Sequence, residues 1–154
     1  MTQAANLFRS LGIGETDVVA YMLPNSNETA ITLMGGCTAG IVNPINPLLE
    51  AEQIAALLKE TNAKVLVTLA GFPKTDVAQK AHEAVKLAGC VETVLEVDLK
   101  RYLSPPLSWI VSLIRPKGEK APGVRCLDFT SELARQNGQA LSFEETTARR
   151  NFPI

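Results

Sequence analysis

Two glycine pairs are the residues of this 154-residue chain whose types could bind a nucleotide phosphate. Such binding needs a glycine turn directly between a strand and the start of a helix, where free backbone amides face the phosphate. Gly12 and Gly14 instead precede a strand-like run, and Gly35 and Gly36 fall within or at the end of a helical pattern, where carbonyls are free. The spacing therefore predicts structural glycines and no phosphate loop.

Nucleophilic catalysis needs a base beside the nucleophile, and the single histidine, His82, lies in an alanine-rich helical pattern. Its neighbour Glu83 points elsewhere on a helix, since residues three or four apart are the ones that face each other. We expect His82 to be a surface or half-buried residue without a role. Two acidic pairs could serve as general acid and base: Glu50 with Glu52, and Glu144 with Glu145. Side chains on solvated helix faces are the better interpretation of both pairs.

The three cysteines, Cys37, Cys90 and Cys126, are far apart and form no Cys-x-x-Cys pair. A closed zinc site takes about four convergent ligands, so no metal site is expected. Buried free thiols are predicted instead.

An apolar octet from Leu107 to Ile114 lies between prolines and contains the single tryptophan, Trp109. With Arg115 and Lys117 beside it, the octet could anchor at a lipid headgroup layer. We favour a packing element for a subunit or a further domain. No catalytic, cofactor-binding or metal-binding residue is assigned in this chain.

Apolar runs alternate with amphipathic runs over the first hundred residues. Buried strands are predicted at 17–23, 41–42, 64–69 and 93–97. One helix is predicted to end near Leu11, and others to span 25–39, 50–62 and 75–88. Asn25 with Glu28 fits a cap of the second helix, and Gly89 stops the last. Strands alternating with helices of about 12 residues predict an α/β fold with a mostly parallel sheet.

The alternation ends near Asp98. Residues 1–100 therefore form a βαβ portion, and residues 101–154 are expected to be an irregular, proline-containing extension of the same incomplete domain. Within it, 126–129 and 130–134 could form a small strand and one or two helical turns. The nearly bulk-free run from Gly35 to Gly40 predicts tight packing of the second helix against a neighbouring sheet.

Composition is typical of a soluble globular protein, with 46% hydrophobic and 20% charged residues. The formal net charge of -1 offers no attraction for a polyanion, so nucleic acid is not an expected partner. No apolar stretch approaches the roughly 20 residues that span a bilayer, and membrane contact is not expected. Without a signal-peptide pattern, a cytoplasmic location is predicted.

Four segments occur in a specific order: DVVAYMLPN at 17–25, a helix with Gly35-Gly36 and Ala39-Gly40, IVNPINP at 41–47, and KVLVT at 64–68. In this order they resemble the AMP-forming acyl-CoA synthetases of the adenylate-forming superfamily, over about residues 4–102. The resemblance implies an incomplete piece of that family's large N-terminal domain, with a partial parallel sheet of flavodoxin-like or Rossmann-like type and crossover helices. It also implies a mutation-sensitive core motif from Gly40 to Pro47.

The reaction implied for the parent family has two steps. A carboxylate attacks the α-phosphorus of ATP to give an acyl-adenylate and pyrophosphate, and the thiol of CoA then displaces AMP to give a thioester. The family holds ATP, Mg²⁺ and CoA with a Ser/Thr/Gly-rich loop ending in lysine, later nucleotide motifs and a C-terminal lid domain. The sequence contains no such loop, so no cofactor is expected to bind this chain.

We therefore expect an inactive N-terminal fragment of a fatty-acyl-CoA synthetase-like ligase of fatty acid metabolism. Its expected partners are the missing remainder of the synthetase and other copies of itself, which would associate through exposed apolar surface. The alternative is a self-standing flavodoxin-like ligand-binding or scaffold module without catalysis.

Overall fold

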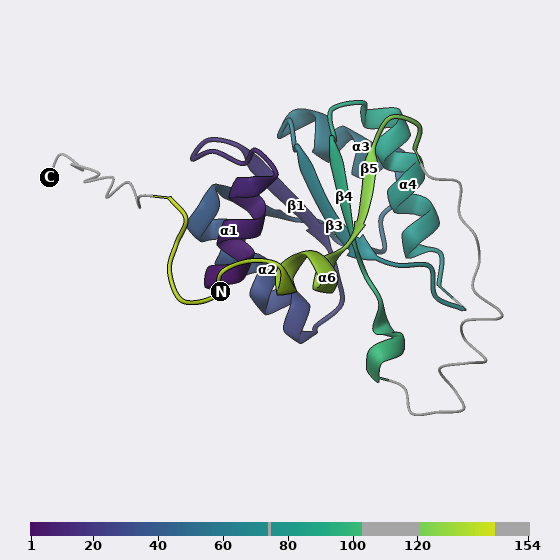
Figure 1. Cartoon of the computed structure of the whole chain (residues 1–154). Helices are drawn as coiled ribbons and strands as arrows, with labels where there is room; N and C mark the ends of the chain where they lie inside the picture. Colours follow the sequence, from purple (N-terminus) through teal and green to yellow (C-terminus); the bar gives the residue numbers. More distant parts are fainter. Residues whose placement is uncertain (74, 103–120, 144–154) are drawn as a thin grey trace, which may run out of the picture.

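A five-stranded sheet forms the centre of the computed structural model, which describes residues 1–73, 75–102 and 121–143 (Figure 1). Its strands are β1 (Val18–Met22), β2 (Ile41–Pro44), β3 (Val65–Leu69), β4 (Thr93–Val97) and β5 (Arg125–Asp128). They lie in the order β2-β1-β3-β4-β5, and all neighbouring pairs are parallel. This is the strand order of flavodoxin-like sheets, so the predicted α/β fold is confirmed.

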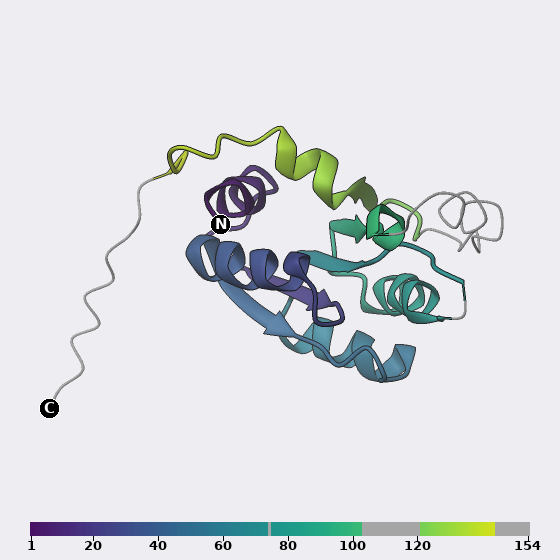
Figure 2. The ribbon, with the colours of Figure 1, turned by 90° about the horizontal axis from the view of Figure 1, so that it is seen from below.

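Helices cover both faces of the sheet (Figure 2). They are α1 (Thr2–Ser10), α2 (Asn27–Ala39), α3 (Ala51–Glu60), α4 (Val77–Ala88) and α6 (Phe129–Ala134), and a 3-10 helix spans Leu99–Tyr102. Successive side chains of a strand point to opposite faces, so the strands contribute to two cores. Ala20 and Leu66 pack with α3 and α4, whereas Val19 and Val65 pack with α1 and α2.

The strands form where the apolar runs predict them, with two extensions. β2 continues past the predicted 41–42, because the residue before a proline favours extended backbone. Asn43 accordingly pairs with Ala20, and Pro44 with Tyr21. The small strand expected at 126–129 forms one residue earlier as β5 and joins the sheet beside β4.

The helix ends require one correction. Ser26, not Asn25, caps α2, and its Oγ accepts a hydrogen bond from the amide of Thr29 at 3.3 Å. Glu28 is buried in the first turn of α2. The stop of α4 at Gly89 is confirmed, since this residue has a φ of 70°, a conformation that glycine adopts without a steric penalty.

The small residues of α2 allow close approach on two sides, not against the sheet alone as predicted. A Cβ atom at Gly35 would lie 3.0 Å from backbone atoms of Ala4 and Ala5 in α1. A Cβ atom at Gly36 would lie 2.5 Å from a methyl group of Val42 in β2. The small residues of α2 therefore let it approach the backbone of α1 closely as well as the sheet.

An ion pair holds the amino end of β1 to that of β3. Asp17 Oδ1 lies 2.8 Å from Nζ of Lys64, and Asp17 Oδ2 accepts a hydrogen bond from the amide of Gly14 at 2.8 Å. The lysine and then the amide hold the pKa of Asp17 below its ordinary value. A lowered pKa contributes stability that is present above the unfolded-state pKa and is lost as pH falls through the folded-state pKa.

Asp17→Asn is expected to make the free energy of unfolding depend less on pH in the acid range. The wild type should lose unfolding free energy steadily below about pH 4, as the carboxylate becomes protonated, and the variant should lose less. Urea unfolding followed by circular dichroism at several pH values measures both slopes. Glu52→Gln, at an exposed position of α3, is the control. Equal slopes for Asp17→Asn and wild type would contradict the expectation.

Candidate functional site

The carboxyl edge of the sheet is where doubly wound proteins bind ligands, at the point where strand order reverses. Here that point lies between β1 and β3, since the chain passes from β1 to its neighbour β2 and then returns to β3 on the other side of β1. A hollow of about 340 Å³ lies beside the carboxyl end of β1. It is lined by Pro24, Asn25, Ser26, Asn27, Leu99 and Tyr102.

A buried acidic side chain lies at the start of α2, near this edge. Glu28, in the first turn of α2, is 4% exposed, and its Oε1 accepts a hydrogen bond from the Tyr102 hydroxyl at 2.8 Å. This hydrogen bond ties the 3-10 helix Leu99–Tyr102 to α2.

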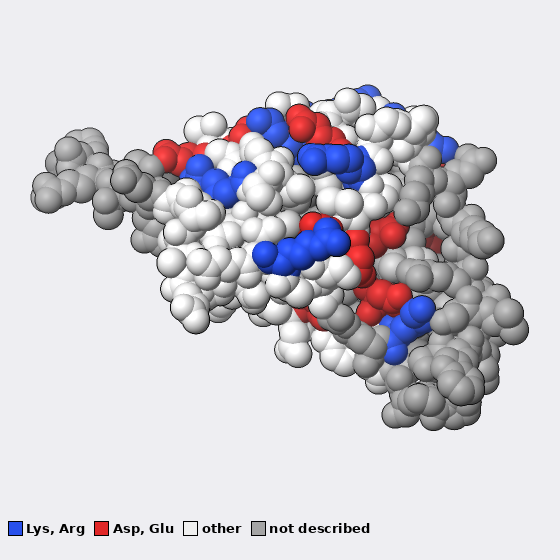
Figure 3. All heavy atoms as spheres, viewed as in Figure 1, with Lys and Arg blue, Asp and Glu red and all other residues white. Residues whose placement is uncertain are grey.

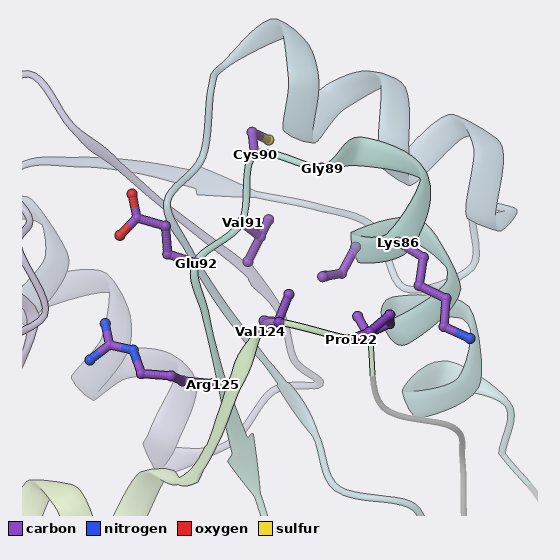
Figure 4. Close-up of a pocket in the computed structure, with 11 residues that line it drawn as sticks. Lys86, Gly89, Cys90, Val91, Glu92, Pro122, Val124 and Arg125 are labelled. Atoms are coloured by element: carbon purple, nitrogen blue, oxygen red, sulfur yellow. The ribbon is translucent and has the colours of Figure 1, made fainter.

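A larger hollow, of about 840 Å³, lies at the amino edge, between the end of α4 and the starts of β4 and β5 (Figure 4). Val91, Val124 and Pro122 point into it, whereas the charged ends of Glu92 and Arg125 point away from them. The centre of the hollow is therefore apolar, and its charged groups lie at the rim.

Cys90 is the thiol beside this hollow. Its Sγ donates a hydrogen bond to the carbonyl of Leu58 at 3.4 Å, and burial raises the pKa of the thiol. Because the thiolate is the nucleophilic form, Cys90 stays protonated and unreactive near neutral pH. The centre of the hollow is apolar, and the thiol of Cys90 beside it is not an activated nucleophile.

His82 is buried, which corrects the expected surface or half-buried position. The residue is 5% exposed, and Nε2 lies 2.9 Å from Oε1 of Glu96 on β4. Glu83 is exposed on the same helix, as expected. The histidine therefore has a structural role, joining α4 to the sheet. A charged residue within the otherwise apolar strand at 93–97 was the sequence signal that could have revealed this pair.

Of the two acidic pairs, only Glu50 with Glu52 lies among the described residues. Glu50 is the N-cap of α3, where it forms a reciprocal capping box with Gln53, and it accepts a hydrogen bond from Lys80 at 3.0 Å. Glu52 is exposed on the same helix. Several candidates lie outside the described residues: Glu144, Glu145, Arg115, Lys117, and the octet from Leu107 to Ile114 with Trp109.

The cysteines are less buried than predicted. Cys37 is exposed on the outer side of α2, and Cys90 and Cys126 are half-buried. Among the described residues, no group of three or more His, Cys, Asp or Glu side chains is placed to hold a metal ion. Within the same part of the chain, no helix has the length and apolar character needed to cross a bilayer.

The sequence model of the family described as AMP-binding enzyme matches residues 1–131, which is most of the chain. The chain belongs to this family. Within it, the chain is similar to marinolic acid–CoA ligase of Pseudoalteromonas sp. (strain SANK 73390), with 41% identity over 78 residues. That alignment covers 51% of the chain and 12% of the relative. Sulfoacetate–CoA ligase of Cupriavidus necator is 34% identical over 98 residues, covering 61% of the chain and 18% of the relative.

Solved structures of AMP-binding enzymes share the fold. The anthranilate CoA ligase AuaEII, in complex with anthranoyl-AMP, superposes with a TM-score of 0.67 over 94% of the chain at 16% identity. An acyl-CoA synthetase from Brucella canis superposes with a TM-score of 0.63 over 91% of the chain at 18% identity. The chain spans only 23% and 21% of these two proteins. The predicted resemblance to acyl-CoA synthetases is confirmed, and the sheet corresponds to part of their fold.

Proposed function

We propose that this AMP-binding family chain forms the flavodoxin-like sheet layer of an acyl-CoA synthetase and does not activate a carboxylate by itself. The observation that supports this most strongly is a family match over residues 1–131, a range that contains all five strands of the sheet. The relatives devote most of their length to other parts. The chain acts as scaffold, and the chemistry belongs to those parts.

Adenylation requires positively charged groups around the phosphates of ATP. Attack of a carboxylate on the α-phosphorus of ATP develops negative charge that cations, amides or Mg²⁺ must stabilise. Two lysines of the described residues are already engaged: Lys64 pairs with Asp17 at 2.8 Å, and Lys80 pairs with Glu50 and Asp76 at 3.0 and 3.2 Å. We assign ATP, Mg²⁺ and CoA to the rest of a complete synthetase and derive no catalytic step from this chain.

The isolated chain is expected to release no pyrophosphate from MgATP in the presence of fatty acids and CoA. The reason is that the two lysines just described are engaged in ion pairs and are not free to stabilise the triphosphate. A coupled pyrophosphate assay with full-length sulfoacetate–CoA ligase and sulfoacetate as positive control measures this. Release that rises in proportion to the concentration of the chain would overturn the proposal.

Helix α2 presents an apolar stripe to solvent. Ala30, Leu33, Met34 and Cys37 are all exposed, and their spacing of three and four residues places them on one side of the helix. The surface over α2, at the lower left of Figure 3, is largely uncharged. A helix that is apolar on all sides is typical of a buried element. The remainder of a synthetase is proposed to cover this stripe, and a second copy to cover it in the isolated chain.

The edge strand β2 is a poorer surface for association. The amides of Ile41 and Ile45 donate to carbonyls of Asp17 and Tyr21 in or beside β1, each at 2.9 Å. Backbone amides alternate in direction along a strand, so the backbone nitrogen of Pro44 points away from β1, toward the open edge. Proline has no amide hydrogen to donate to an added strand there. Association through the stripe of α2 is favoured over strand pairing.

Met34→Glu is expected to reduce self-association of the isolated chain. Met34 is 57% exposed, so a charge there remains solvated in the monomer but would be desolvated in a dimer. Sedimentation velocity over a range of concentrations, under reducing conditions, measures the change. Leu87→Glu, at a 46% exposed position on α4, is the matched control. A wild-type chain that stays monomeric throughout would count against this interface.

A self-standing flavodoxin-like binding module is the second candidate. The strand order and the hollow of about 340 Å³ at the carboxyl edge favour it. The amides of Asn25 and Asn27, which line this hollow, suit a small polar ligand. Binding of a nucleotide or coenzyme to the isolated chain would support this module.

A cytoplasmic location and a role in fatty acid metabolism complete the proposal, and the role in fatty acid metabolism rests on the resemblance to acyl-CoA synthetases. Neither nucleic acid nor a membrane is proposed as a partner. Basic and acidic side chains lie interspersed on the face shown in Figure 3, which offers no extended positive surface for an anionic polymer or lipid layer.

A further inference from the structure

Asn6 is a buried polar side chain on α1, with 2% of its surface exposed. Its Nδ2 donates hydrogen bonds to the carbonyls of Asn137 and Ala140, both at 2.9 Å. Its Oδ1 accepts hydrogen bonds from the amide of Ser142 at 2.8 Å and from the hydroxyl of Ser142 at 3.0 Å. Four bonds thus join one side chain of the first helix to a segment more than 130 residues later in the chain.

The side-chain amide is fully used by this arrangement. An asparagine offers two donor hydrogens and a carbonyl oxygen with two lone pairs, and each of these is matched here. An aspartate lacks the donors, and an apolar residue would leave buried carbonyls without partners. The geometry therefore selects asparagine in particular.

Neighbouring contacts extend the attachment along α1. Gln3 donates from Nε2 to the carbonyl of Gln136 at 3.1 Å, and the guanidinium of Arg9 lies 4.3 Å from the ring centroid of Phe143. These three residues of α1 follow one another at three-residue spacing and so lie near one side of the helix. The segment 136–143 is held at its start, centre and end.

The path of the segment is visible in two orientations. After α6, the chain runs alongside α1 rather than returning to the sheet (Figures 1 and 2). We propose that Asn6 is a positioning residue, which holds residues 137–142 on α1 and so fixes the direction in which the chain leaves the sheet layer. This step rests on the proposed function: in a complete synthetase, the direction of the chain sets where the following part begins.

Hydrogen exchange followed by NMR on the full chain tests this without nucleotide or substrate. In Asn6→Ala, the amide of Ser142 should exchange at least about 30-fold faster, because its acceptor is lost, while core amides such as that of Leu66 keep their rates. In Asn6→Asp, which retains an acceptor but not the donors, acceleration should be intermediate. Gln3→Ala removes one hydrogen bond nearer the start of the segment. It should change the exchange rate of the Ser142 amide by less than about 3-fold.

Two results would overturn the inference. One is an unchanged exchange rate of Ser142 in Asn6→Ala. The other is an equal acceleration of Ser142 and Leu66, which would show that Asn6 supports the whole fold and does not position the segment. If Asn6→Ala does not fold, the comparison of Asn6→Asp with wild type decides between the same outcomes. Since no pyrophosphate is measured, these outcomes are independent of the activity of the chain.

Discussion

Gly40→Ala is expected to lower the free energy of unfolding by about 3 kcal/mol. A Cβ atom at this position would lie 2.6 Å from the carbonyl oxygens of both Gly14 and Asp17, and 2.8 Å from a methyl group of Ile13. Two of these neighbours are backbone atoms and cannot rotate away. Relief requires the turn before β1 to move.

That movement would break the hydrogen bonds that begin the sheet. The carbonyl of Asp17 accepts from the amide of Ile41 at 2.9 Å, and the carbonyl of Gly14 accepts from the amide of Asp17 at 3.1 Å. The loss is therefore expected in the pairing of β1 with β2 as well as in overall stability. Urea unfolding by circular dichroism measures the latter, and amide exchange of Ile41 measures the former.

Gly89→Ala is the matched control for this substitution. Gly89 has a φ of 70°, and a Cβ atom there would meet nothing within 4 Å. The control should lose only the cost of a left-handed alanine, about 1 kcal/mol. Equal losses in the two variants would contradict the close approach at Gly40 and, with it, the expected sensitivity of the core motif from Gly40 to Pro47.

Gly35→Ala is expected to destabilise the chain by about 2 kcal/mol, although alanine favours a helix by about 1 kcal/mol over glycine. Its Cβ would lie 3.0 Å from backbone atoms of Ala4 and Ala5 and closer still to the Cβ of Ala4. The steric term exceeds the helix-propensity gain, because α1 must shift as a unit. The sign of the effect therefore reports on the α1–α2 contact.

A double-mutant cycle isolates this contact. Ala4→Gly removes the nearest carbon, so the double variant Ala4→Gly with Gly35→Ala should be more stable than the sum of the single effects predicts. Gly36→Ala meets one movable methyl group of Val42 and should cost less than Gly35→Ala. A stabilised Gly35→Ala protein would show that the two helices lie further apart than described.

The strands were predictable from local sequence, but the order across the sheet was not. The run at 64–69 forms β3, which is buried along its whole length, and an apolar run is what a strand covered on both faces requires. The position of β5 beside β4 depends on contacts between distant segments, for which the run around Cys126 carries no local signal. Prolines predicted extended backbone at β2, though not how far its pairing with β1 continues.

The polar contacts of the candidate site escaped prediction for the same reason. Periodicity reports which face of a helix is apolar, and a buried polar residue on that face has no visible partner in the sequence. Tyr102 lies 74 residues from Glu28, and Ser142 lies 136 residues from Asn6. His82 was expected to be a surface or half-buried residue, and its burial was missed because its partner Glu96 belongs to another element. Such pairs become apparent only when the topology brings the elements together.

Isothermal titration calorimetry of the folded chain with MgATP, AMP, CoA and FMN tests the scaffold role most directly. The expected result is no binding heat for any of them at ligand concentrations up to about 1 mM, because Lys64 and Lys80 are held in ion pairs and the amino-edge hollow is apolar at its centre. A dissociation constant of about 1 μM or less for any of the four would contradict the account and identify a self-standing binding module.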